Sequence, residues 1–209
     1  MGKVLVVSAS LGGFDEPRKH AKQSIDCDYY QYTDENFPPR KNSMTPRLQA
    51  RICKMFSWQT KPDYDFYIWV DSSCRLAHKD SVKWFLEKLG DEDAVFFKHP
   101  HRKTIQEEAD YLKERLAKKC PYITPRYEGE RIDDQLAVVD PTAELYATTA
   151  FAYKNDTQAR DLLTVWWLHT SLYHSIDQLS LPNAIEKSGA SHNVIPDNYL
   201  KCKYLEYMR

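Results

Sequence analysis

A carboxylate follows directly after a short apolar run in the middle of this sequence. Residues 66–70, Phe-Tyr-Ile-Trp-Val, are aromatic and β-branched, so they predict a buried strand that ends at Asp71. Ligands of open α/β sheets bind beyond the carboxyl ends of the strands, where Asp71 is expected to lie. A hard divalent cation prefers oxygen ligands and neutralises phosphate charge. A carboxylate at this position therefore indicates a binding site for a metal ion that carries a phosphorylated ligand. The alternative interpretation is that Asp71 only caps the helix that begins near Lys79.

The segment before this strand places basic residues on one helical face. Thr45 and Pro46 predict the start of a helix, with Thr as the N-cap and Pro at the first helical position. Arg47, Arg51 and Lys54 then recur at spacings of four and three, so they share one face. Three cations close to a metal-binding carboxylate could hold a diphosphate. The alternative is a basic face exposed to solvent.

Small and polar residues follow the first predicted strand, which begins at Lys3. They are Ser8, Ala9, Ser10 and Leu11, and two glycines come next. Such a loop lets the backbone approach a nucleotide closely. The sequence lacks the pattern GxGxxG, so a plain tight turn remains the alternative.

Histidines with candidate roles follow later in the chain. His99 and His101 come directly after a predicted strand at 94–97, where they could bond substrate hydroxyls or phosphate, or ligate a metal. His192 lies in a predicted loop at 191–196. A lone loop histidine is usually incidental, but it is also the right residue type for a second metal ligand near Asp71.

Another polar cluster, Asp177 and Gln178, follows a helix predicted over residues 157–173. Asp177 is a candidate general base or a stabiliser of positive charge on a sugar carbon. Gln178 is a candidate for contacts with hydroxyl groups.

Strands and helices alternate along the whole chain. This order predicts an α/β fold with a mainly parallel central sheet flanked by helices. A chain of 209 residues is long enough for one well-filled core, so a single domain is expected.

The composition excludes several classes of protein. Lys and Arg number 29 against 30 Asp and Glu, whereas a dedicated nucleic-acid-binding protein normally shows a basic excess. The five cysteines form no CxxC pair, so reduced thiols in a reducing, cytoplasmic compartment are expected. No apolar run approaches the roughly 18 residues of a membrane span, so we expect a soluble protein.

Three pieces of the sequence together resemble nucleotide-sugar glycosyltransferases of the GT-A fold. They are similar in particular to a glycosyltransferase-like family that includes plant mucilage-related hexosyltransferases. The first piece is the basic helix followed by the strand that ends in Ile68-Trp69-Val70-Asp71, and the second is His99 to Arg102 with Glu107 and Glu108 in the following helix. The third runs from Glu144 through Trp166-Trp167 to Ser175-Ile-Asp-Gln-Leu-Ser180, and it resembles the family signature Arg-Asp-Gln-Leu-Ser/Phe.

The resemblance covers roughly residues 45–185, and the compact size is also similar to amino-terminal glycosyltransferase domains of chlorovirus glycosylation proteins. It implies one GT-A-like domain over residues 1–209, which is compatible with the amino-terminal part of a longer protein. It also implies transfer of a hexose or deoxyhexose from a UDP-sugar donor to a hydroxyl of a glycan or glycoprotein acceptor, with retention favoured over inversion.

The resemblance further implies roles for the candidate residues. Mn²⁺ or Mg²⁺ would bind the diphosphate at Asp71 and His192, and Asp177 would act near the anomeric carbon. The residues expected to line the donor site are Ser8, Ala9, Ser10, Leu11, Arg47, Arg51, Lys54, Ser73, Arg75, His99, His101 and Gln178.

Two positions depart from the family pattern. GT-A enzymes usually carry Asp-x-Asp, but Ser73 stands at the second acidic position, and Ile176 stands where the family tends to have Arg. The missing carboxylate favours one alternative, a non-catalytic nucleotide-sugar-binding module. The other alternative is a phosphatase of the haloacid-dehalogenase type, but that chemistry normally needs a second Asp where this chain has Ser73.

Overall fold

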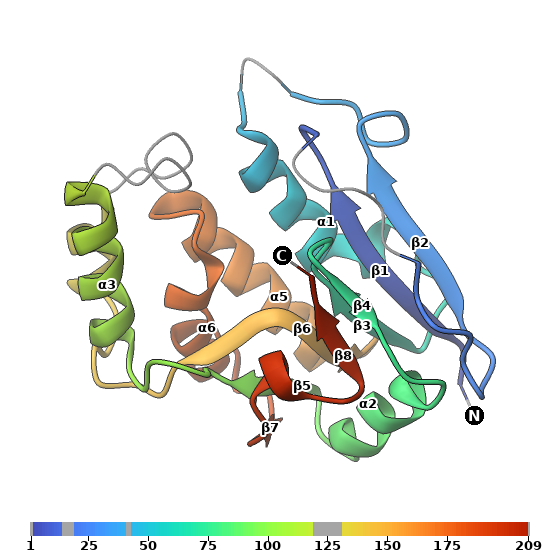
Figure 1. The fold of residues 1–209 in the computed structure, drawn as a ribbon. Coiled ribbons are helices and arrows are strands. Elements are labelled where there is room, and N and C mark those ends of the chain that lie inside the picture. Colours follow the sequence, from blue (N-terminus) through green and yellow to red (C-terminus); the bar gives the residue numbers. More distant parts are fainter. Residues whose placement is uncertain (1, 14–18, 41–42, 119–130, 209) are drawn as a thin grey trace.

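A six-stranded sheet forms the centre of the computed structural model, which describes residues 2–13, 19–40, 43–118 and 131–208 (Figure 1). The strand order is β2-β1-β3-β6-β5-β7. The bounds are Val4–Ser10 for β1, Asp28–Thr33 for β2, Phe66–Val70 for β3, Ala94–Lys98 for β5, Tyr146–Lys154 for β6 and His192–Ile195 for β7. All of these strands are parallel except β6, which runs antiparallel to both of its neighbours. The predicted α/β class and mainly parallel sheet are therefore confirmed.

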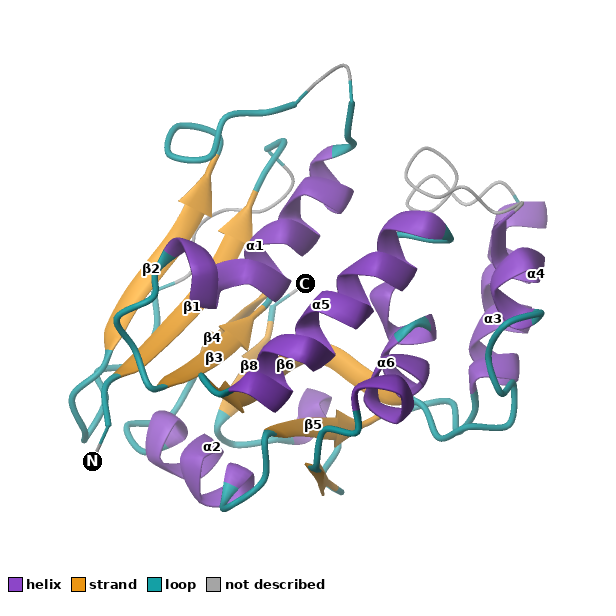
Figure 2. Ribbon diagram, turned by 180° about the vertical axis from the view of Figure 1, so that it is seen from behind, coloured by secondary structure: helices purple, strands orange, loops and turns teal. Residues whose placement is uncertain are grey.

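Helices cover both faces of this sheet. Helices α1 (Pro46–Thr60), α5 (Thr157–Leu172) and α6 (Leu181–Ser188) lie against one face, which is in front in Figure 2. Helix α2 (Ser81–Leu89) and a small sheet of β4 (Cys74–Leu76) and β8 (Leu205–Tyr207) lie against the other face. The 3-10 helix η2 (Tyr199–Lys201) leads into β8.

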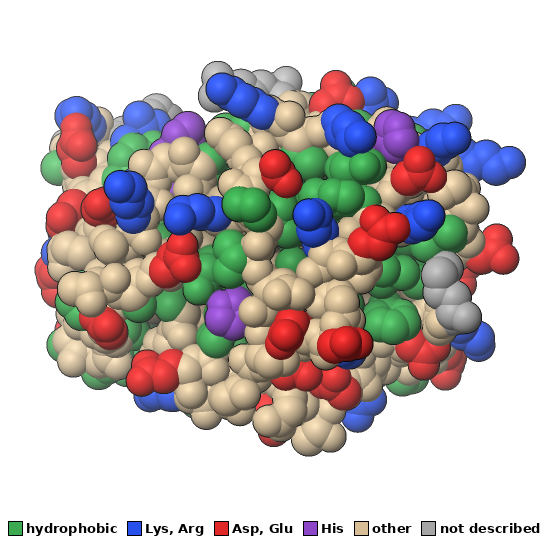
Figure 3. Space-filling view, turned by 90° about the horizontal axis from the view of Figure 1, so that it is seen from below, with side chains coloured by type: hydrophobic (Ala, Val, Ile, Leu, Met, Phe, Trp, Pro, Cys, Tyr) green, Lys and Arg blue, Asp and Glu red, His purple; other side chains and the backbone are tan. Residues whose placement is uncertain are grey.

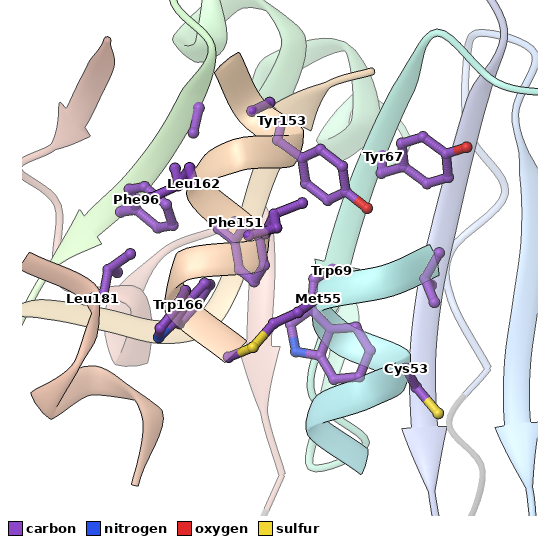
Figure 4. Packing of buried hydrophobic residues seen from close by; sticks show 14 of the residues in the cluster. Cys53, Met55, Tyr67, Trp69, Phe96, Phe151, Tyr153, Leu162, Trp166 and Leu181 are labelled. Atoms are coloured by element: carbon purple, nitrogen blue, oxygen red, sulfur yellow. The ribbon is translucent and has the colours of Figure 1, made fainter. Parts of the chain in front are cut away.

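The alternation of side chains along each strand separates the two cores. Trp69 of β3 points to the α1 and α5 side, whereas Ile68 and Val70 point to the α2 side. On the first side, Trp69, Phe151 and Trp166 pack between the sheet and helices α1 and α5 (Figure 4). The residues on which the site depends are therefore held by a dense aromatic core.

A third and smaller core lies at one end of the sheet. Helices α3 (Ile105–Ala117) and α4 (Arg131–Leu136) pack there with the 3-10 helix η1 (Asp177–Leu179). Ile105, Ile132 and Leu179 are buried in this cluster. In the sequence, η1 directly follows α5, and α5 packs against the central sheet. The segment η1 therefore connects the third core to the central sheet.

Strand β6 carries an irregularity next to the carboxyl end of β3. Its pairing with β5 jumps from Phe96–Phe151 to Phe97–Ala147, which leaves residues 148–150 outside this ladder. Bulges of this kind bend a strand and re-aim its backbone groups. Here the carbonyl oxygens of Thr148 and Thr149 become available to side chains and backbone of the candidate site, as described below.

Acidic and basic side chains are intermingled on the face of the molecule where α2 and the N-terminus lie (Figure 3). This agrees with the nearly balanced charge of the sequence. Within the described ranges, no helix combines the length and apolar character needed to cross a membrane.

Candidate functional site

Asp71 lies at the carboxyl end of β3 and is held by its own neighbours. Its backbone N–H donates to the Thr149 carbonyl oxygen at 2.8 Å, and its carbonyl oxygen accepts from the N–H of Cys74 at 2.8 Å. The indole Nε1 of Trp69 donates to Asp71 Oδ1 at 2.7 Å. The side chain is 31% exposed. Helix α2 begins only at Ser81, with Asp80 at its N-cap, so the interpretation of Asp71 as a helix cap is wrong.

The basic face of α1 points into the protein. The helix begins as predicted, because the Thr45 hydroxyl caps it and Pro46 opens it. Lys54 is only 1% exposed and Arg51 is also buried, so the interpretation of this face as solvent-exposed is wrong. Arg47 lies one turn before Arg51 on the same helix. Its positive charge, like those of Arg51 and Lys54, lowers the pKa of the buried carboxylate of Asp177.

Lys54 connects the two candidate carboxylates. Its Nζ lies 2.6 Å from Asp177 Oδ2 and 3.7 Å from Asp71 Oδ1. It also donates to the Thr148 carbonyl oxygen at 2.6 Å, a group that the irregularity in β6 makes available. The rings of Trp69, Phe151 and Trp166 surround the ammonium at 5.6 to 5.7 Å. Lys54 therefore lies beneath the site, where its donors serve the protein itself.

Asp177 is a buried carboxylate at the start of η1 and is 2% exposed. Arg51 Nη2 lies 3.3 Å from Oδ1, and the Thr148 hydroxyl donates to the same oxygen at 3.0 Å. Burial raises the pKa of Asp177, but Arg51 and Lys54 together lower it further, so the pKa lies below its ordinary value. A carboxylate so stabilised in its ionised form is a weak base, which argues for a positioning role rather than proton transfer.

A second polar cluster extends from Gln178, the next residue along η1. Gln178 Nε2 donates to Glu108 Oε1 at 2.6 Å, and Glu108 forms an ion pair with Arg102. Arg102 Nη2 lies 3.4 Å from Nε2 of His99. Burial, together with the charge of Arg102, lowers the pKa of His99 to about 4, so His99 is neutral at pH 7. Asp71 follows β3 and His99 follows β5. The structure connects these two residues through Asp177 and Gln178, which are neighbours in η1.

The loop after β1 lies at the same edge of the sheet as Asp71. The prediction of a loop that begins at Ser8 is wrong, because β1 extends to Ser10 and pairs there with β2. Val7 of β1 pairs with Trp69, so the residues from Ser8 onward continue beside the end of β3. Ala9 and Leu11 point into the core, so their backbone, rather than their side chains, is what a ligand could meet. Gly12 adopts a positive φ of 74°, and its N–H donates to the carboxylate of Asp34. Ser10, partly exposed, ends the strand.

Other predicted site residues have partners or positions elsewhere. Arg75 lies on β4, where its guanidinium pairs with Glu206 of β8 at 2.6 Å. The carbonyl oxygen of Ser73 accepts from the N–H of Met208 at 2.8 Å. His101 is exposed, and its backbone N–H donates to Nδ1 of His99 at 3.3 Å.

His192 is not brought to Asp71. It begins β7 rather than lying in a loop, and it pairs with Ala94 at the amino end of β5. Asp71 follows the carboxyl end of β3, and strands β6 and β5 lie between β3 and β7. His192 instead contacts the Tyr146 hydroxyl at 3.2 Å. The prediction of a loop overlooked the β-branched residues Val194 and Ile195, which favour a strand in this segment.

Sequence reasoning missed groups that complete the site. Thr148 and Trp166 were not among the predicted site residues, but the Thr148 hydroxyl donates to Asp177 and the Trp166 indole donates to the Asp177 carbonyl oxygen at 2.7 Å. Glu108 carried a usable signal, because Ile105, Ala109 and Leu112 place it on the buried face of α3. A charged residue on such a face needs a partner, and that requirement marks it as a candidate.

The donor chemistry of Asp71 fits a cation that arrives with a phosphorylated ligand. Asp71 Oδ1 is occupied by Trp69, whereas the structure gives Oδ2 no partner among the described residues. In that same part of the chain, no group of three or more His, Cys, Asp or Glu side chains gathers as a ready metal cage. Mg²⁺ and similar ions often take one or two carboxylates and complete their shell with phosphates and water.

Comparison of the chain with protein-family models and with curated proteins found no match.

Proposed function

We propose that this protein is a metal-assisted glycosyltransferase that uses a UDP-sugar donor. The observation that carries the proposal is the setting of Asp71, whose Oδ1 is fixed by the Trp69 indole at 2.7 Å while the carboxylate remains 31% exposed. A fixed, accessible oxygen at the carboxyl edge of a mainly parallel sheet suits a metal-bound diphosphate. The neighbouring loop after β1, with its positive-φ glycines, supports a nucleotide beside it.

The charge of the buried cluster supports an anionic ligand. Arg51 and Lys54 lie on the buried face of α1 close to Asp177 and Asp71, and the charge of Arg47 also acts on Asp177. Charges in surroundings of low polarity act over longer distances than in water. The positive charges of this helix face therefore support a diphosphate at the sheet edge without direct contact to Lys54.

Mn²⁺ or Mg²⁺ bound at Asp71 would act as a Lewis acid on the charge that develops on the leaving UDP. The protein's own part is to fix Asp71 through Trp69 and Lys54 and to supply the positive field of α1. His99 and Gln178 are candidates for contacts with sugar hydroxyls, because their cluster adjoins Asp177. The buried position of Asp177 favours a retaining reaction, since an inverting enzyme needs an accessible base for the acceptor hydroxyl.

The sequence motifs that resemble GT-A glycosyltransferases support the same proposal. The mixed sheet with one antiparallel strand and the small β4–β8 sheet beside it are compatible with that fold. The acceptor would be a hydroxyl of a glycan or glycoprotein, as the resemblance implies.

A second candidate is a nucleotide-sugar-binding module without catalysis. Ser73 in place of a second carboxylate and the burial of Asp177 favour it, because both reduce the groups that could take part in a reaction. The two candidates share the donor site and differ in turnover.

Calorimetric titration of UDP in Mn²⁺, and again in EDTA, tests the proposal on wild type and on Asp71→Asn. We expect binding that needs Mn²⁺ and is lost in the variant, while Asp161→Asn, an exposed aspartate on α5, binds like wild type. Failure of the wild type to bind UDP with Mn²⁺, or unchanged binding by Asp71→Asn, would overturn the assignment. Screening UDP-sugars for hydrolysis or transfer then separates the enzyme from the binding module.

A further inference from the structure

Glu108 is a buried carboxylate to which neither the sequence motifs nor the proposed chemistry gives a task. It lies on α3, is 2% exposed, and contacts two side chains. One oxygen pairs with Arg102, and the other accepts from Nε2 of Gln178 at 2.6 Å. Because Arg102 carries the opposite charge, the buried carboxylate is not left without a partner.

The chemistry of Glu108 fixes the orientation of the Gln178 amide. An ionised carboxylate can only accept hydrogen bonds, so Gln178 must turn its NH₂ group toward Glu108. The carbonyl oxygen Oε1 of Gln178 then points away from Glu108. The structure gives this oxygen no hydrogen-bond partner among the described residues, and the side chain is partly exposed.

Gln178 lies between the two polar clusters of the candidate site. Gln178 follows Asp177, whose carboxylate shares Lys54 with Asp71. On its other side, Glu108 and Arg102 connect Gln178 to His99. The free carbonyl oxygen therefore belongs to the series of polar residues that runs from Asp71 through Asp177 to His99 at the carboxyl edge of the sheet.

We infer that Glu108 is a positioning residue that presents the carbonyl oxygen of Gln178 as a hydrogen-bond acceptor for a sugar hydroxyl. The inference rests on the proposed function, because the hydroxyl is taken to be one of the UDP-sugar donor. It predicts that the site selects a hydroxyl, a donor group, at this position. The UDP part of the ligand binds elsewhere, at Asp71 and the loop after β1.

The test compares UDP with UDP-glucose and UDP-galactose by calorimetry in Mn²⁺. In Glu108→Gln, the side chain at position 108 can donate as well as accept, so the Gln178 amide is free to turn. We expect the affinity for the better UDP-hexose to fall about fivefold to tenfold, while the affinity for UDP changes less than twofold. Glu114→Gln, on the exposed side of the same helix, should bind both ligands like wild type.

A double-mutant cycle separates positioning from a general structural effect. Gln178→Met removes the acceptor, so adding Glu108→Gln to that variant should cause no further loss of UDP-hexose affinity. The side-chain amide signal of Gln178 in ¹⁵N NMR should also shift in Glu108→Gln and stay in place in Glu114→Gln.

Several results would overturn the inference. Wild-type UDP-hexose affinity in Glu108→Gln, or equal losses for UDP and UDP-hexose, would remove the positioning role and leave the proposed function intact. A wild type that binds neither UDP nor a UDP-hexose would overturn both.

Discussion

Lys54 and Asp177 form an ion pair inside the protein, with Nζ and Oδ2 2.6 Å apart and side chains that are 0% and 3% exposed. Removing both charges from water carries a large desolvation cost, which their attraction and their further hydrogen bonds offset. Burial lowers the pKa of Lys54, although Asp177 and Asp71 oppose this change. The pair joins α1 to η1, two segments far apart in the sequence, directly beneath Asp71.

Breaking this pair from one side should be costly. Asp177→Asn keeps the shape of the side chain but leaves Lys54 and Arg51 buried without their main counter-charge. We expect the free energy of unfolding to fall by about 3 to 5 kcal/mol, measured by urea denaturation. The matched control is Glu87→Gln, which breaks an exposed pair with Lys83 on α2 and should cost less than about 0.5 kcal/mol. Equal small losses in both variants would contradict the buried pair.

Removing both partners should be less harmful than the two single changes suggest. In Lys54→Met combined with Asp177→Asn, both charges of the pair are removed, so the core no longer contains a lysine charge that lacks its partner. We expect the double variant to be at least about 1 kcal/mol more stable than the sum of the single losses predicts, by the same urea measurement. Additive losses would show that the two residues do not interact.

The local elements of this fold could be predicted from the sequence because their signals are local. Thr45 and Pro46 mark the start of α1, and the run that ends at Asp71 marks β3. The spacing of Arg47, Arg51 and Lys54 also gives the correct shared face. The burial of that face could not be predicted, since it depends on Asp177, which lies more than a hundred positions away.

Other parts of the site depend on pairing that no local pattern contains. The antiparallel direction of β6 and its irregularity at Thr148 arise from how distant strands meet, so side-chain periodicity does not show them. The same holds for His192, which residue type suggested as a metal ligand and which the register places at the other end of the sheet. The position of Asp71 could be predicted because it follows from the end of a single strand.

A pH-dependent loss of stability should arise at His174, which is 2% exposed. Burial, with a contribution from the charge of Arg47, lowers its pKa to about 4. The unfolded chain binds this proton near pH 6.5, so stability is fully retained above pH 6.5 and falls as the pH drops toward 4. The loss from this residue should reach at most about 3 kcal/mol.

The test replaces His174 by Asn, whose side-chain oxygen can still accept the Ile176 N–H that now donates to Nδ1 at 3.1 Å. Urea midpoints at pH 7.5 and 5.0 should differ less in His174→Asn than in wild type. His101→Asn, an exposed control, should keep the wild-type difference. An unchanged difference in His174→Asn would show that this histidine does not take part in the acid destabilisation.

The indole of Trp69 should matter to ligand binding as well as to stability. Trp69→Phe keeps an aromatic ring in the core but removes the N–H that fixes Asp71 Oδ1 at 2.7 Å. We expect a loss of about 1 to 3 kcal/mol in the free energy of unfolding, from the hydrogen bond and the smaller ring. The carboxylate of Asp71 is then free to rotate, so Mn²⁺-dependent UDP affinity should fall about threefold to tenfold.

Trp84→Phe supplies the control for that prediction. Trp84 is also largely buried, but it stacks on Tyr204 on the α2 side of the sheet, away from Asp71. Its replacement should reduce stability to a similar extent without changing the affinity for UDP. If both tryptophan variants lost UDP affinity in parallel with their stability, the effect at Trp69 would be one of general packing. A loss of affinity confined to Trp69→Phe would instead show that the indole sets the position of the Asp71 carboxylate.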